Sequence, residues 1–292
     1  MSALSARREY DVASLCDLSR WRGRAWLAAC YIPVGAVLLV LRLLALGILA
    51  AVAWFVPTRL KSSLFRLSLL SSGFIVSHEL PRAEIARLTH SKVVAYNHVS
   101  LIDGLVVWSM PNAVLLAADP ASNASTFNSY YFGFLARTFG SSILVLDDLR
   151  AFSHKVAKWR KDVNAPAFYI APEGTIGNGS GLFAFEKFAF GLGRPVVPLC
   201  ITVKPAFAMR PHPLMSSHLA NILWLYALPY VTVELALLDS QSRREGESAV
   251  AFAERIQHVM AEHLGAVPTE CTRADKRALR ARRLAMLEAS HG

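Results

Sequence analysis

Apolar residues are nearly continuous from Ala25 to Pro57, where Arg42 is the single charged residue. This run exceeds the ~20 residues of one helical membrane span but falls short of two full spans. Basic residues flank both ends, so a helical hairpin with both ends in the cytosol satisfies the positive-inside rule best. Pro33, Gly35 and Gly47 are available as helix breakers for such a hairpin. A single tilted span is the alternative.

After residue 91, short apolar runs alternate with stretches of helical periodicity. The expected strands are 92–96, 113–118, 142–146, 167–171 and 196–203, and the expected helices are 101–109, 126–138 and 149–161. A second section adds an apolar helix at 217–228, a strand within 230–238 and an amphipathic helix near 247–264. This alternation predicts an α/β fold with a mixed sheet flanked by helices, preceded by an N-terminal membrane-embedded helical hairpin.

The same patterns divide the chain into consecutive segments. They are a basic and aromatic cytosolic N-terminus (1–24), a membrane hairpin or anchor (25–57), an amphipathic connector (58–90), the α/β core (91–205), a C-terminal part of the same domain (206–271) and a basic tail (272–292). The tail is expected to be either a basic helix or disordered.

Composition supports a membrane-associated protein. Apolar residues make up 54% of the chain and charged residues 18%, against about 25% charged in an average soluble domain. The net charge of +10 suits anionic lipid headgroups or phosphate-bearing substrates. No nucleic-acid-binding motif accompanies it, so nucleic acid is not an expected partner. The four cysteines show neither disulfide nor metal-ligand spacing, so reduced thiols and no metal site are expected.

A histidine and an aspartate, His98 and Asp103, follow the first expected strand of the core. An imidazole can take a proton there while a carboxylate one turn later fixes its tautomer and stabilises its charged form. Asn97 and Ser100 add polar groups at the same strand end, where α/β folds build their sites. The alternative is a structural pair, since a histidine near an aspartate is often only that. No nucleophile lies nearby, which points to a substrate hydroxyl in that role.

A second polar cluster follows the expected strand 167–171. Glu173, Gly174 and Thr175 lead into a glycine-rich loop, with Lys187 a little further on. Glycines let main-chain N–H groups approach an anion, Glu173 and Thr175 suit hydroxyl binding, and Lys187 offers a charge to a phosphate. A flexible turn is the alternative.

Together these clusters resemble three of the four sequence blocks of the glycerolipid acyltransferase family, which includes lysophosphatidate and lysophosphatidylcholine acyltransferases. The matching blocks are Asn97-His98 with Asp103, Glu173-Gly174-Thr175, and Val196-Val197-Pro198-Leu199, within roughly residues 90–205. The resemblance implies a mixed α/β domain at a membrane face, with His98 as general base and Asp103 as its orienting partner. It also implies that Glu173, Gly174 and Thr175 help to hold a lysophospholipid acceptor.

The second block of this family departs from the pattern. The family places an arginine shortly after a Gly–aromatic stretch, where it binds the phosphate of the acceptor. Residues 131–134 and Gly140 match that stretch, but Asp147 and Asp148 occupy the arginine's position, and Arg150 is the displaced candidate. Two carboxylates would repel a phosphate.

The function implied by the resemblance is acyl-CoA-dependent transfer of a fatty acyl group to the hydroxyl of a lysophospholipid of the 1-acylglycerol-3-phosphate type. Acyl-CoA would be a co-substrate, with no bound cofactor. Residues 31–35, 39–43 and 272–276 also resemble a lipid-droplet and endoplasmic-reticulum branch of the family. That branch implies these membranes as the location, with the catalytic domain facing the cytosol. The alternative is a catalytically weak or inactive monotopic protein that acts in lipid-droplet regulation or protein recruitment.

Overall fold

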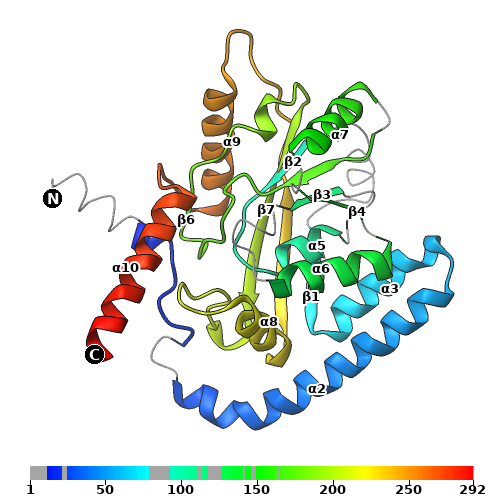
Figure 1. Ribbon diagram of the computed structural model, residues 1–292, viewed down its shortest axis with the longest axis vertical. Helices are drawn as coiled ribbons and strands as arrows, with labels where there is room; N and C mark the ends of the chain where they lie inside the picture. Colours follow the sequence, from blue (N-terminus) through cyan, green and yellow to red (C-terminus); the bar gives the residue numbers. More distant parts are fainter. Residues whose placement is uncertain are drawn as a thin grey trace.

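A computed structural model describes residues 12–21, 25–78, 93–108, 110, 114–117, 126–140, 142–145, 149–162 and 165–291. Its centre is a seven-stranded sheet in the order β1-β8-β7-β2-β5-β3-β4 (Figure 1). The strands are β1 (Phe74–His78), β2 (Val93–Tyr96), β3 (Val114–Ala117), β4 (Ser142–Val145), β5 (Phe168–Ile170), β7 (Val196–Pro205) and β8 (Val231–Leu237). Neighbouring strands are parallel except β7 and β8, which confirms the mixed α/β fold.

Helices cover both faces of the sheet, and the alternation of side chains along β2 shows how. Val94 and Tyr96 belong to the core beneath one layer of helices, whereas Val93 and Ala95 belong to the core beneath the other. The first layer contains α3 (Thr58–Ser71), α5 (Asp103–Trp108), α6 (Thr126–Phe139) and α8 (His218–Ala227), and the second contains α7 (Leu149–Lys161), the short η2 (Ala189–Gly191) and α9 (Ala249–Leu264). The helices expected in the core and after Pro205 are therefore confirmed.

One strand of the seven-stranded sheet was not expected from the sequence. β1 lies inside the segment 58–90, for which only an amphipathic connector was predicted, and pairs with β8 at the edge of the sheet. The part of that segment after His78 lies outside the described residues. β1 pairs in parallel with a strand far along the chain, and such a partner leaves no local signal in the sequence.

The C-terminal segment forms a helix, α10 (Arg273–His291), so the helical alternative for the basic tail is the one found. Its first turns pack on the domain through a small separate core of apolar residues. This core joins the N-terminal segment, the loop after β5 and α10, and contains Val12, Leu15, Cys16, Phe183, Leu214, Cys271 and Leu279. A short two-stranded sheet of β6 (Gly181–Leu182) and β9 (Val267–Pro268) lies beside it.

The apolar N-terminal segment is one continuous helix, α2 (Ala25–Phe55), with Pro33 inside it. The predicted hairpin within 25–57 is therefore wrong in its position, because Pro33, Gly35 and Gly47 do not break the helix. The chain reverses only after Phe55, where Pro57 is extended (φ −57°, ψ 147°), and a proline disfavours helical conformation in the residue before it. The returning helix α3 packs against α2, as Figure 1 shows.

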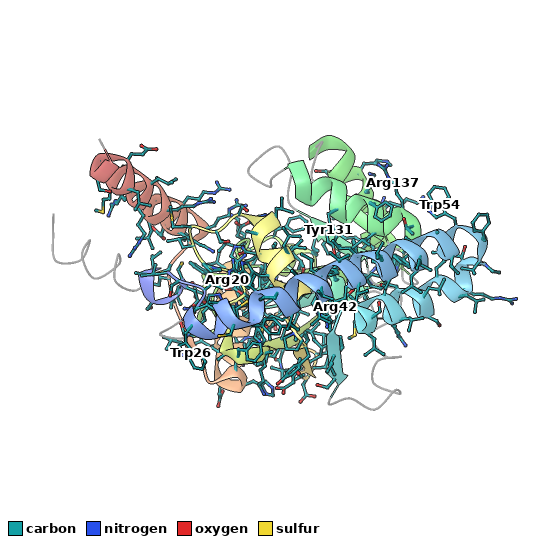
Figure 2. The ribbon with its side chains drawn as sticks, turned by 90° about the horizontal axis from the view of Figure 1, so that it is seen from below. Arg20, Trp26, Arg42, Trp54, Tyr131 and Arg137 are labelled. Atoms are coloured by element: carbon teal, nitrogen blue, oxygen red, sulfur yellow. The ribbon has the colours of Figure 1, made fainter. Side chains whose placement is uncertain are left out.

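Arg42, the charge within the apolar run, points into the protein instead of toward lipid. Its side chain is 8% exposed, and its guanidinium donates to the carbonyls of Tyr226 (2.8 Å), Leu228 and Pro229 (2.7 Å). These carbonyls lie at the C-terminal end of α8, where helix carbonyls lack partners within the helix and a positive charge is favoured. Arg42 thus ties α2 to α8 from the middle of the long helix (Figure 2).

The other side of α2 is an apolar surface without protein cover among the described residues. α2 is long and apolar enough to cross a membrane, yet its contacts with α3, α6 and α8 place it along the flank of the domain (Figure 1). Leu46, Ala50 and Ala53 face inward and are buried. The outward side chains form what we call the outer face of α2, namely Trp26, Ile32, Val34, Val37, Val40, Leu41, Leu43, Leu44, Ile48, Val52, Trp54 and Phe55.

Candidate functional site

The candidate site lies where β2 and β5 end side by side. The two strands are parallel neighbours, with Ala95 opposite Ile170. The loops that follow them therefore meet at the same edge of the sheet, as parallel strands require. Main-chain bonds join the two loops, because the amide of Gly177 donates to the carbonyl of His98 at 2.7 Å. The two polar clusters singled out in the sequence thus form one site.

His98 and Asp103 are in direct contact. The Nδ1 atom of His98 lies 3.0 Å from Oδ2 of Asp103, and the side chains are 23% and 0% exposed. A carboxylate accepts, so Nδ1 carries the proton and Nε2 is left as the basic nitrogen of the ring. The partial exposure of the imidazole beside a fully buried carboxylate is the arrangement that a general base and its orienting partner need.

Asp103 also fixes the loop that carries the histidine. The same Oδ2 atom accepts from the main-chain amides of Val99 (2.6 Å) and Ser100 (2.8 Å). The carboxylate lies in the first turn of α5, where a negative charge is favoured. The spacing from His98 to Asp103 thus lets one carboxylate close the turn and hold the ring together.

Glu173 holds the other side of the same loop. Its Oε1 accepts from the amide of His98 (2.8 Å), and its Oε2 accepts from the amide of Phe183 (2.9 Å). The residue is 2% exposed, and this burial raises the pKa of Glu173 to about 8, while the two amides oppose the rise. Both oxygens are occupied by main-chain donors, so Glu173 is placed to position His98. Acceptor binding by Glu173 stays a prediction that would require these bonds to open.

Other residues from the two clusters have structural contacts as well. The side-chain amide of Asn97 donates to the carbonyl of Ile201 (2.9 Å) and accepts from its amide (2.7 Å), which extends the pairing of β2 with β7 by one side chain. Asn97 and Ser100 are 1% and 0% exposed. Gly174 and Thr175 lie nearer the surface, and Gly174 adopts a positive φ of 60° that glycine accommodates best.

Lys187 lines a separate cavity, and the side chain of Arg150 is outside the described part of the chain. Lys187 is exposed and lines a cavity of about 460 Å³ between α7, η2 and α9, with Arg160 and apolar side chains; His98 is not among its lining residues. Arg150 lies in the first turn of α7, but its side chain is outside the described part of the chain. Asp147 and Asp148 also lie outside it. Phosphate binding by Arg150 or Lys187 stays a prediction.

Side chains from distant segments complete the surroundings of His98. The ammonium of Lys276, in the first turns of α10, donates to the carbonyl of Ile176 in the Glu173 loop. His212 and His218 have ring centroids 5.4 Å apart; burial lowers the pKa of both, and the nearby His98 lowers them further. From the sequence, Lys276 was placed in a basic tail with no role in the site, and the two histidines were not singled out. In the described residues, no cluster of three metal-binding side chains is found.

The chain is similar in sequence to two kinds of curated protein, although no family model matches it. It is 28% identical to the lipid droplet-regulating VLDL assembly factor AUP1 of Xenopus laevis over 254 residues, which is 84% of this chain and 59% of that protein. It is 27% identical to the lysophospholipid acyltransferase LPCAT4 of Mus musculus over 202 residues, which is 64% of this chain and 36% of that protein. The chain therefore spans less than two thirds of the length of either relative.

The fold is that of a solved acyltransferase. The crystal structure of the 1-acyl-sn-glycerophosphate (LPA) acyltransferase PlsC from Thermotoga maritima superposes with a TM-score of 0.54, at 14% sequence identity, over 82% of this chain and 96% of that one. At this identity the superposition is evidence for the fold alone. The similarity to particular proteins rests on the sequence relatives. The predicted resemblance is thus confirmed: the chain is similar to the glycerolipid acyltransferases in sequence and fold, and to the lipid-droplet AUP1 proteins in particular.

Proposed function

We propose that the protein transfers a fatty acyl group from acyl-CoA to the hydroxyl of a lysophospholipid of the 1-acylglycerol-3-phosphate type, as a step in glycerophospholipid metabolism. The observation that carries this proposal is the partly exposed His98 held 3.0 Å from the fully buried Asp103. Nε2 takes the hydroxyl proton as the hydroxyl oxygen attacks the thioester carbon. The carboxylate of Asp103 stabilises the imidazolium, which then returns the proton to the departing coenzyme A thiolate.

The developing oxyanion needs donors other than the amides closest to His98. The amides of His98, Val99, Ser100 and Gly177 already donate within the protein. A preorganised donor must already point, without another acceptor, at the position where the charge forms in the transition state. Charge stabilisation in this proposal therefore comes from side chains around the loop or from groups brought by the substrate.

The outer face of α2 supports action at a lipid surface. A continuous apolar surface of this size is a feature of sites that contact membranes or partners. Tryptophans near both ends of α2 (Figure 2) suit the boundary between lipid and water. We place the protein on the endoplasmic-reticulum membrane and the lipid droplet, with the domain facing the cytosol. The AUP1 relatives, described as lipid droplet-regulating, support this placement.

A second function is favoured by the same relatives and by the acidic pair Asp147 and Asp148. In this case the protein acts in lipid-droplet regulation or protein recruitment and has little or no acyltransferase activity. The site geometry favours the enzyme, because a binding protein has no need for a basic nitrogen kept exposed by a buried carboxylate.

The deciding experiment is an acyl-transfer assay with the full chain, labelled acyl-CoA and a panel of lysophospholipids. We expect His98→Ala to lower the rate by about 100-fold or more, the range for loss of a general base. His258→Ala is the matched control, because His258 is an exposed histidine on α9. Undiminished transfer by His98→Ala would contradict the mechanism. If the wild-type protein transfers no acyl group to any acceptor, the second function is supported.

A further inference from the structure

Lys276 brings a positive charge from α10 to the loop beside His98. Its ammonium donates to the carbonyl of Ile176, and the next residue, Gly177, donates its amide to the carbonyl of His98. The ammonium also lies 5.9 Å from the ring of Phe183, whose amide is bound by Glu173. Burial lowers the pKa of Lys276, while the nearby Glu173 opposes that shift.

Two histidines, His212 and His218, lie just before α8 and at its first residue. The amide oxygen of Asn221 accepts from the guanidinium of Arg20 at 2.6 Å, so the Asn221 nitrogen faces Nδ1 of His212 at 2.9 Å. Nδ1 of His212 must therefore accept, which leaves Nε2–H as the donor of that ring. Burial holds the pKa of His212 well below its usual value, so the ring is neutral at pH 7. His218 lies beside it on the first turn of α8.

Arg280 adds an exposed charge to the same region. It lies one helical turn after Lys276 on α10 and therefore on the same side of the helix. Leu214, between His212 and His218, and Leu279, next to Arg280, belong to the same small core, so the start of α8 lies close to α10 here. Within the described part of the chain, Arg280 makes no ion pair with a carboxylate.

The carboxylates in this region are already engaged. Asp103 and Glu173 accept from main-chain amides, Asp17 pairs with Arg210 at 2.9 Å, and Glu186 lies 3.5 Å from Arg273. Cationic side chains are therefore in excess over free carboxylates beside His98.

We infer that Lys276, Arg280 and His218 form a phosphate-binding site next to His98, supplied by α10 and α8. The inference rests on the proposed function for the identity of its ligand, a phosphate carried by the lysophospholipid acceptor or by acyl-CoA. An anion here gains a charge-assisted contact from the exposed guanidinium. It also lies within reach of the field of the buried ammonium, which is weakly screened by water. Such a site would compensate for the acidic pair at Asp147 and Asp148.

The test compares Arg280→Gln with Arg277→Gln in the full chain. Both arginines are exposed on α10 and both changes remove one charge, but only Arg280 lies one helical turn from Lys276 on the same side of the helix. Binding of coenzyme A and of glycerol 3-phosphate is measured by titration calorimetry, and the KM values for acyl-CoA and lysophosphatidate are measured separately. We expect Arg280→Gln to weaken the binding of one probe by about tenfold or more and to raise the KM of the corresponding substrate by a similar factor. This is the usual effect of losing a contact to a charged group. Arg277→Gln should stay close to wild type.

The two probes identify the source of the phosphate. Weaker binding of coenzyme A alone assigns the site to the acyl donor, and weaker binding of glycerol 3-phosphate alone assigns it to the acceptor. Equal losses in the two variants, or none in Arg280→Gln, would overturn the inference. The proposed function fails separately, if the wild-type protein binds a probe through Arg280 and still transfers no acyl group.

Discussion

The loop around His98 and the helix α2 differ in the burial and bonding of their side chains. Around His98, the buried side chains of Asp103, Glu173 and Asn97 bind main-chain groups, and Asp103 also contacts the imidazole. On α2, most large apolar side chains are exposed in the described structure. The first region finds most of its hydrogen-bond partners within the protein, whereas the outer face of α2 is exposed in the described structure. A partner without polar groups, such as lipid, suits α2 best.

Arg42 is a buried polar side chain that binds main-chain carbonyls from within the apolar helix α2. Its replacement should have the largest effect on stability. We expect Arg42→Leu to lower the free energy of unfolding by about 3 kcal/mol, because buried carbonyls at the end of α8 would lose their donor. Urea unfolding in detergent measures this change. Arg59→Leu, at an exposed position of α3, is the control. If both variants unfold alike, Arg42 does not anchor α2.

The outer face of α2 should separate membrane binding from stability. We expect the double change Leu44→Ser and Ile48→Ser to weaken binding to phospholipid vesicles by about tenfold, since both side chains are exposed and apolar. The melting temperature should barely change. Leu46→Ser, between them but buried, should lower the melting temperature and leave vesicle binding intact. The reverse result would show that α2 is oriented differently.

Glu173 should give the smallest effect, a pH dependence of stability. Burial raises the pKa of Glu173 from 4.5 to about 8. The stability that this group contributes is fully present below pH 4.5 and is lost as the pH rises through about 8. We expect the wild-type protein to lose stability between pH 5 and pH 8 relative to Glu173→Gln. Thermal unfolding of both proteins across this range tests the sign, and parallel curves would contradict the burial argument.

Local patterns were sufficient for the core strands and for the pairing of His98 with Asp103. Strand ends carry their polar residues next to them in sequence, and parallel neighbours bring such ends together. The roles of Asn97 and Glu173 could not be read in the same way. Their partners are the main-chain groups of Ile201 and Phe183, and no sequence signal marks which amide a side chain will bind.

Two features could not be predicted because they depend on contacts between distant segments. They are the position at which the chain reverses after α2 and the surroundings of Lys276. Flanking charges favoured a reversal inside 25–57, but Arg42 finds its partners on α8 and α2 continues without a break. Lys276 belongs to a segment that reads as a solvated basic tail. It becomes part of the site only because Leu279 and Cys271 anchor α10 on the domain.

The contact of Arg42 with the end of α8 requires a residue without a side chain at position 73, here Gly73. A Cβ atom on this residue would lie 2.2 Å from Nη2 of Arg42, and its φ is +81°. The phenolic oxygen of Tyr31 binds the carbonyl of Ala227 at 2.8 Å, so α2 is fastened at two points along its length. These two contacts, made by Tyr31 and Arg42, prevent α2 from rotating about its helix axis. The protein itself therefore fixes the orientation of the outer face of α2, independently of contact with lipid.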